Sequence, residues 1–138
     1  MLERVIEQKL ELSASQEHVW QAITDPEKIS RWFGDEAEID LKANGHGVMS
    51  WKDHGCYAVR VEEVTPPHRL VWSWVHEPGV AFEDAPSTRV EWELTTCENG
   101  STALSLREAG FLTALHHEQN MDGWKHELRE LEELLATG

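Results

Sequence analysis

The chain has 138 residues, of which 26 are Asp or Glu and 12 are Lys or Arg, and its formal net charge at pH 7 is −14. Binding to nucleic acid or to an anionic membrane requires a basic face that releases counterions, so this charge argues against both as partners. The length fits one domain with a substantial core, and we expect residues 1–138 to form it without metals or disulfides.

The N-terminal sequence lacks the basic segment and the apolar core of a signal peptide. No apolar run approaches the roughly 20 residues that are needed to span a bilayer. We therefore expect a cytoplasmic protein. Cys56 and Cys97 follow neither a metal-site spacing nor the framework of a secreted disulfide protein, so both are expected to be reduced thiols.

The first third of the chain predicts one strand and two short helices. Residues 5–12 alternate between apolar and polar side chains, which is typical of a half-buried strand. Ser13 and Ser15 are candidate N-caps of a first short helix. The pair Asp25-Pro26 is a strong start signal for a second helix, which we expect to continue up to Gly34.

The middle of the chain predicts six strands that are separated by turn residues. Apolar and polar side chains alternate within these segments, and pairs such as Asn44-Gly45, His54-Gly55 and Asn99-Gly100 stand between them, so each junction is expected to be a hairpin. The expected strands begin near residues 37, 48, 57, 69, 88 and 104.

The connection from Glu77 to Ser87 is longer than the other connections. Long loops in small domains are more often functional or mobile than idle. Val80 and Phe82 lie at its centre. They either fold back as a lid over an apolar opening or belong to a flexible loop with a locally packed Phe82.

The stretch from Thr113 to Gly138 predicts one long amphipathic helix. Apolar residues recur at alternate steps of three and four, and charged residues occupy the positions between them. Nothing else in the chain offers a second helix of this length, so its apolar face is expected to lie on a curved antiparallel sheet. Gly123, which has no side chain, is expected to let the helix backbone approach that sheet. The apolar positions are Met121, Trp124, Leu128, Leu131 and Leu135.

Several stretches, taken in this order of elements, resemble a known superfamily. They are residues 23–34, with the sequence ITDPEKISRWFG, residues 63–74, residues 87–94 and the pair Gly123-Trp124. With them the chain resembles the helix-grip superfamily, which includes START-domain, Bet v 1-like and polyketide cyclase proteins. More narrowly, it is similar to the family related to the activator of the Hsp90 ATPase.

The resemblance implies an α+β fold. In it a curved seven-stranded antiparallel sheet wraps around the long C-terminal helix, two short helices lie between the first and second strands, and a cavity separates sheet and helix. Members of the superfamily include ligand carriers, cyclases and co-chaperone domains, so the function has to be argued from the site.

Strand alternation places an aromatic-rich set of side chains on the concave side of the expected sheet, opposite the helix. Such a chamber predicts binding of a small apolar molecule, aromatic or lipid-like, through an opening near Phe111, His117 and the long loop. The alternative is that the indole rings simply fill the core. The predicted ligand-binding residues are Met49, Trp51, Trp72, Trp74, Trp92, Glu108, Phe111, His117, Met121 and Trp124.

Few ionisable side chains share the concave face. Glu108 together with His76 or His117 offers general acid–base chemistry of the cyclase or dehydratase kind, but no sequence spacing holds such a pair together. We therefore expect binding rather than catalysis and assign no catalytic residue, with a cavity enzyme as the alternative.

No metal site and no cofactor is predicted. The adjacent His116 and His117 diverge by about 100° around a helix and cannot converge on one ion. No phosphate-binding glycine loop or dinucleotide fingerprint is present in the sequence. A protein-binding module like the Hsp90 activator's domain is a further alternative, and a monomer and a homodimer both stay open.

Overall fold

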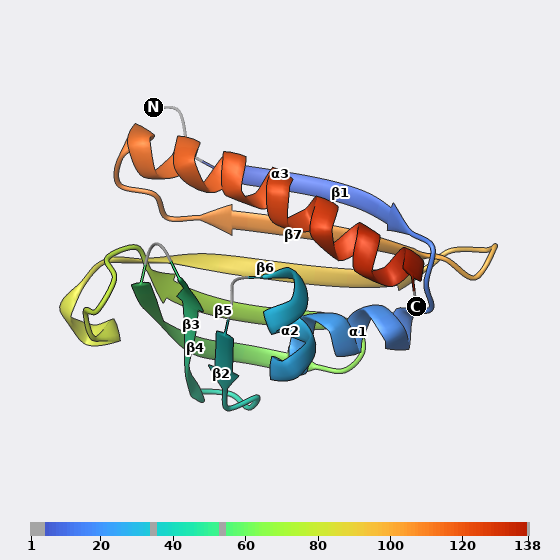
Figure 1. Ribbon diagram of the computed structural model, residues 1–138, viewed down its shortest axis with the longest axis horizontal. Helices are drawn as coiled ribbons and strands as arrows, with labels where there is room; N and C mark the ends of the chain where they lie inside the picture. The colour runs from blue at the N-terminus through green and yellow to red at the C-terminus, as the bar shows by residue number, and fades with distance from the viewer. Residues whose placement is uncertain (1–4, 34–35, 53–54, 138) are drawn as a thin grey trace.

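A computed structural model describes residues 5–33, 36–52 and 55–137 (Figure 1). The described residues form one strand, two short helices, six further strands and a long helix, which confirms the predicted order. Gly34, His54 and Gly138, where we expected a helix end, a turn and the end of the long helix, lie outside the described residues. The elements are β1 (Ile6–Leu12), α1 (Gln16–Thr24), α2 (Pro26–Trp32), β2 (Glu36–Ile39), β3 (His46–Trp51), β4 (Gly55–Thr65), β5 (Arg69–Val75), the 3-10 helix η1 (Phe82–Asp84), β6 (Ser87–Thr96), β7 (Thr102–Ala109) and α3 (Ala114–Thr137).

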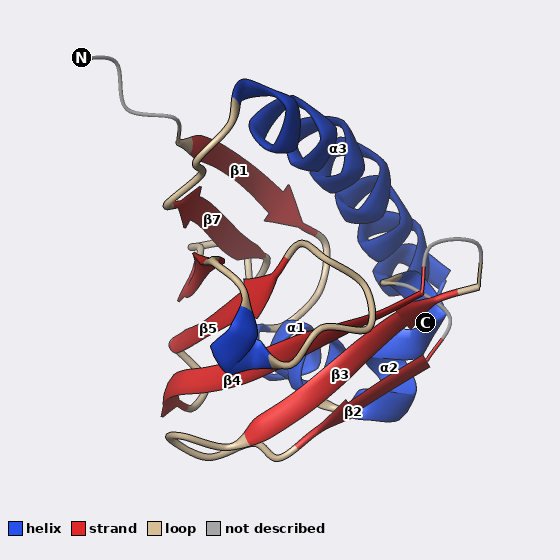
Figure 2. Cartoon of the chain, turned by 90° about the vertical axis from the view of Figure 1, so that its left-hand side faces the viewer, coloured by secondary structure: helices blue, strands red, loops and turns tan. Residues whose placement is uncertain are grey.

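The described strands form one seven-stranded antiparallel sheet in the order β1-β7-β6-β5-β4-β3-β2. From β2 to β7 each strand pairs with its neighbour in sequence, whereas β1 pairs with β7, so β1 and β2 are the two edges. The sheet curves around α3, which lies along its concave side (Figure 2). This arrangement confirms the predicted helix-grip fold.

The two short helices begin at predicted caps: Ser15, one of the two candidates, caps α1, and Asp25 caps α2. Ser15 Oγ accepts a hydrogen bond from the backbone N–H of His18, and Asp25 Oδ1 accepts one from Glu27 immediately before the first helical turn of α2. The two helices are tied together because Trp32 Nε1 donates to the backbone carbonyl of Ala22 at 2.7 Å. Phe33, the C-cap of α2, is thereby held at the concave face.

The core lies between α3 and the concave face of the sheet. Trp92 is central, because its ring contacts those of Trp32, Trp72 and Trp124 at centroid distances of 5.5–5.9 Å. On α3 the predicted apolar stripe is buried at Trp124, Leu128 and Leu131. None of the described helices combines the length and the apolarity that crossing a membrane requires.

Gly123 does not play the predicted role in helix packing. A Cβ atom built on Gly123 would meet no heavy atom within 4 Å, so the interpretation that Gly123 brings the helix close to the sheet was wrong. A glycine that permits close approach would place neighbouring atoms around that position. Gly123 instead faces open space, and the helix approaches the sheet through the large ring of Trp124.

The long connection packs locally. The backbone N–H of Gly79 donates to the carbonyl of Cys56 at 2.8 Å, and the Arg60 guanidinium lies over the Phe82 ring, 4.6 Å from its centroid. Arg60 stands between Val59 and Val61, whose side chains are buried on the concave side, so it belongs to the convex face. Of the two alternatives for Phe82, local packing is the observed one.

Candidate functional site

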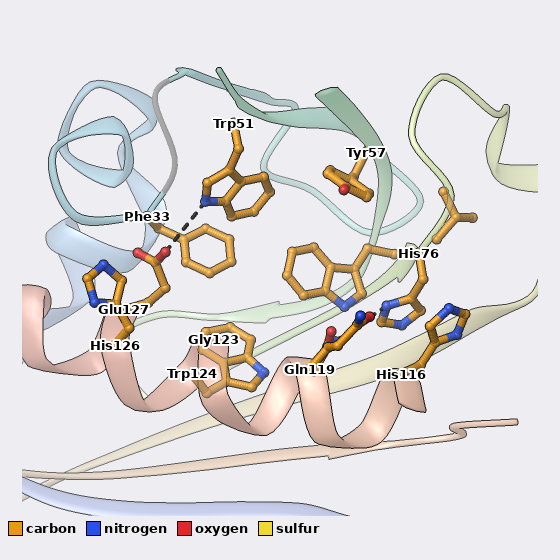
Figure 3. Close-up of a pocket in the computed structure, with 13 residues that line it drawn as sticks. Phe33, Trp51, Tyr57, His76, His116, Gln119, Gly123, Trp124, His126 and Glu127 are labelled. Carbon is orange, nitrogen blue, oxygen red and sulfur yellow. Dashed lines mark hydrogen bonds between the residues drawn. The ribbon is translucent and has the colours of Figure 1, made fainter. Parts of the chain in front are cut away.

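A pocket of about 470 Å³ opens between the concave face of the sheet and the N-terminal half of α3 (Figure 3). Strands β3, β4 and β5 supply one side, α3 supplies the other, and the end of α2 supplies its floor. The described residues that line it are Phe33, Trp51, Tyr57, Trp74, Val75, His76, His116, Gln119, Asn120, Gly123, Trp124, His126 and Glu127.

The apolar part of the pocket is a set of rings that pack on one another. Phe33 stacks on Trp74 and on Trp124, with centroid distances of 5.5 and 5.1 Å, and meets Trp51 edge-on at 5.0 Å. Trp51 in turn contacts Tyr57 at 5.5 Å. These rings come from β3, β4, β5, α3 and the end of α2 and support one another, so the aromatic wall is formed before any ligand enters.

A buried carboxylate lies behind this wall. Glu108 on β7 is fully buried, and its Oε1 accepts the indole N–H of Trp124 while its Oε2 accepts that of Trp74, each at 2.7 Å. The amide nitrogen of Asn120 lies 3.2 Å from both oxygens, and the Thr88 hydroxyl donates to Oε2. Every partner is a donor and an ionised carboxylate only accepts, so Glu108 fixes the orientation of both indoles and of the Asn120 amide.

His76 joins this network through Thr88. Its Nε2 lies 2.6 Å from Thr88 Oγ1, and the single hydroxyl proton of Thr88 is already donated to Glu108. The His76 Nε2–H must therefore be the donor to Thr88, which leaves Nδ1 as the acceptor of a neutral imidazole. Burial lowers the pKa of His76; the nearby Glu108 acts in the opposite direction, and His116 adds to the lowering. Burial and the nearby His116 therefore both favour the neutral form of His76.

The opposite end of the pocket, near His126, reaches solvent. Trp51 Nε1 points toward Glu127 Oε1 at 3.5 Å, as the dashed line in Figure 3 marks. His126 is exposed and pairs with Glu130 at 3.3 Å. The aromatic interior therefore lies between a solvated end near His126 and a buried polar end near His76.

A second pocket of about 210 Å³ lies beside the first, under the start of α3. Phe111 and Leu112 contribute to its lining, and His76 and His116 line both pockets. The rings of these two histidines stack at 5.4 Å. They therefore form the partition between the two pockets.

The structure brings only part of the predicted ligand-binding set together. Trp51, Trp74 and Trp124 line the larger pocket, and Phe111 lines the smaller one. Glu108 lies behind Trp74 and Trp124 and is bonded to both, without being among the lining residues.

The other predicted residues lie away from the larger pocket. Met49, Trp72 and Trp92 are at most 1% exposed and belong to the core, and Met121 packs against that core in a half-buried position. His117 faces β1, because its Nε2 lies 3.1 Å from the backbone carbonyl of Val5. It therefore lies at the sheet edge, about 100° around α3 from its pocket-lining neighbour His116.

Sequence reasoning missed most of the polar lining. On α3 a second stripe of small and polar residues runs beside the apolar one, at steps of four, three and four. This helical spacing of small and polar residues could have predicted a third face of α3, half-buried and lying between the apolar core face and the solvent-exposed face. The stripe consists of His116, Asn120, Gly123 and Glu127.

Phe33 and Tyr57 were also missed. Phe33 reaches the pocket only because α2 ends at that point in space, which no local pattern indicates. Among the residues that the structure describes, no group of three or more His, Cys, Asp or Glu side chains is placed to hold a metal ion.

Residues 13–136 match the family model described as Activator of Hsp90 ATPase homolog 1-like protein. No curated protein matches the chain. The match to the family model spans nearly all of the described elements, from the residues before α1 to the end of α3.

Solved structures show the same fold. DynU16, a protein in the dynemicin biosynthetic locus, matches with a TM-score of 0.83 and 22% identity over 99% of this chain and 49% of that chain, so this chain spans about half of its length. CalU16 from Micromonospora echinospora matches with a TM-score of 0.70 and 30% identity, over 92% of this chain and 71% of that chain. The Aha1 dimer from Colwellia psychrerythraea matches with a TM-score of 0.76 and 18% identity, over 98% of this chain and 96% of that chain.

Proposed function

The chain belongs to the Activator of Hsp90 ATPase homolog 1-like family, and from this premise we propose that it binds a small apolar molecule, aromatic or lipid-like, between the sheet and α3. The observation that carries the proposal is a pocket of about 470 Å³ with walls of stacked aromatic rings. This volume lies within the roughly 300–1,000 Å³ that is typical of small-molecule sites.

The position of Gly123 supports the proposal. A glycine in the interior of a helix costs about 1 kcal/mol of stability relative to alanine, and a Cβ atom on Gly123 would meet no heavy atom within 4 Å. The residue lines the pocket, so the missing side chain leaves that volume empty. Packing against neighbouring atoms does not require a glycine at this position. The need to leave space for a ligand in the pocket would explain it.

The surroundings of Glu108 favour binding over the acid–base alternative. All of its described partners are donors that hold it in place, and Trp74 and Trp124 stand between it and the pocket. A general acid or base has to reach the proton that it transfers, directly or through one water. Glu108 is therefore a residue that positions the pocket wall.

Calorimetric titration with 2-methoxynaphthalene, a flat apolar probe without a hydrogen-bond donor, tests the proposal. We expect saturable binding by the natural chain and at least a tenfold loss of affinity in Gly123→Leu, because the leucine side chain enters the pocket. Gly123→Ala adds only a methyl group and should retain most of the affinity. Both variants should gain roughly 1 kcal/mol in urea denaturation, since each improves helix propensity.

This gain in stability separates a blocked pocket from a damaged fold. Equal affinity of the natural chain and Gly123→Leu for the probe would show that the pocket is not the binding site. Absence of any binding by neutral naphthalenes to the natural chain would refute the proposed function itself.

A further inference from the structure

We infer that the pocket selects neutral aromatic molecules that carry a hydroxyl group and disfavours their carboxylate analogues, because its buried end presents hydrogen-bond acceptors beside a buried negative charge. This inference rests on the proposed function and specifies the ligand class of the same site. The residues that carry it are Asn120, His76 and Glu108.

Glu108 determines which end of the Asn120 amide faces the pocket. A carboxylate accepts hydrogen bonds and cannot donate them, so the Asn120 nitrogen, 3.2 Å from both Glu108 oxygens, must point toward it. The Asn120 carbonyl oxygen is then turned away from Glu108. It has no hydrogen bond to any residue in the described ranges, although Asn120 lines the pocket. The amide therefore offers a ligand an acceptor.

His76 adds a second acceptor at the same end. Its Nε2–H is donated to Thr88, so the lone pair remains on Nδ1. The nearest donor to Nδ1 is the Asn120 amide nitrogen, at the long distance of 3.4 Å, and that nitrogen is shared with Glu108. The Asn120 oxygen and His76 Nδ1 at this end of the pocket can therefore both accept a hydrogen bond from a ligand, which a hydroxyl group can donate and an ether or a carboxylate cannot.

The buried charge acts against anionic ligands. Glu108 is fully buried, and a ligand group bound at Asn120 would lie close to its carboxylate, in surroundings that screen charge poorly. The chain as a whole carries a formal charge of −14, which also repels anions over longer distances. A carboxylate in place of the hydroxyl would lose the hydrogen bond and meet a like charge.

Three naphthalenes with one scaffold test the inference by calorimetric titration of the natural chain at pH 7.5. They are 2-naphthol, which donates a hydrogen bond, 2-methoxynaphthalene, which does not, and the anion 2-naphthoate. We expect 2-naphthol to bind about fivefold more tightly than 2-methoxynaphthalene, as one additional hydrogen bond of ordinary strength provides. The affinity for 2-naphthoate should be at least tenfold below that for 2-naphthol.

Asn120→Leu supplies the second test, since it removes the Asn120 acceptor while filling a similar space. It should reduce the preference for 2-naphthol over 2-methoxynaphthalene below fivefold, because Nδ1 of His76 then remains as the second acceptor. The matched control is Asp122→Leu, a polar-to-leucine change at an exposed position of α3 that does not line the pocket. This control should keep the fivefold preference.

The outcomes separate the inference from the proposed function. Equal binding of 2-naphthol and 2-methoxynaphthalene, or tighter binding of 2-naphthoate, would overturn the inference while the pocket remained a binding site. Absence of binding by all three compounds would overturn both. If Asn120→Leu does not fold, the comparison of the three compounds on the natural chain still decides the question.

Discussion

Exchange of Glu108 for glutamine replaces one carboxylate oxygen by an NH₂ group and changes the shape of the side chain very little. The two oxygens of Glu108 accept hydrogen bonds from different indoles. Oε1 accepts the indole N–H of Trp124, and Oε2 accepts that of Trp74 and the Thr88 hydroxyl. A carboxamide has one oxygen. Whichever way it turns, its NH₂ group faces an indole N–H, donor against donor.

The expected cost follows from this geometry. A buried donor that loses its partner costs about 1–3 kcal/mol, and hydrogen bonds to a charged acceptor are worth about 1.5–3 kcal/mol. Glu108→Gln leaves at least one indole N–H unpaired and weakens the bond that remains. We expect the free energy of unfolding to fall by about 2–4 kcal/mol, which is a large share of the stability of a domain of this size.

Urea denaturation of a double-mutant cycle measures the effect. Trp124→Phe removes the N–H that would oppose the glutamine, so the two changes together should cost less than the sum of their separate costs, with a coupling of about 1 kcal/mol or more. Trp92→Phe is the matched control. Trp92 is equally buried and its Nε1 has no hydrogen-bond partner among the described residues, so its coupling to Glu108→Gln should be smaller than that of Trp124→Phe. A change of less than about 0.5 kcal/mol in the free energy of unfolding for Glu108→Gln alone would refute the argument that both indole N–H groups need a carboxylate oxygen as acceptor.

Three further substitutions test the division of α3 into core and surface and the protonation of His76. Trp124→Ala should lower the free energy of unfolding by about 3–5 kcal/mol in urea, because it leaves a cavity and removes one of the two donors to Glu108 Oε1, whereas His117→Leu at the sheet edge should cost less than about 1 kcal/mol. Equal losses would mean that α3 is core throughout. The pKa of His76 is lowered in the folded protein from its ordinary value of 6.5, so protons bind preferentially to the unfolded chain, and stability should fall as the pH drops below about 6.5. His76→Gln should lessen the difference between stabilities measured at pH 7.5 and 5.5, and an unchanged difference would show that His76 does not contribute to it.

The fold was predictable because its signals are local. Alternating apolar and polar residues set the faces of the strands, and the pair Asp25-Pro26 marked the start of α2, where the Asp25 side chain caps the helix. The apolar repeat of α3 needed only the helical period, and its buried residues are those expected from it. Each of these patterns involves residues within one or two turns of each other.

The pocket depends on where elements cross, and the strand pattern does not contain this information. Trp72 and Trp74 share one face of β5, yet Trp72 is 1% exposed in the core while Trp74 lines the pocket at 8%. The donors around Glu108 come from β5, β6 and α3, and they meet through the register between β6 and β7 and the path of α3 across the sheet. A prediction of that network would have required the strand register and the helix position in advance.

The seven described strands do not close into a barrel, so within the described part of the chain the outer sides of β1 and β2 carry backbone groups without a partner strand. Such edges are templates on which a second chain can add a strand and start aggregation. Here β2 has four residues, of which Glu36 and Glu38 are exposed, and β1 exposes Glu7, Lys9 and Glu11. A chain that added itself to either edge would have to place its own charges beside these. Association of two copies is therefore expected to use another surface than these two edges.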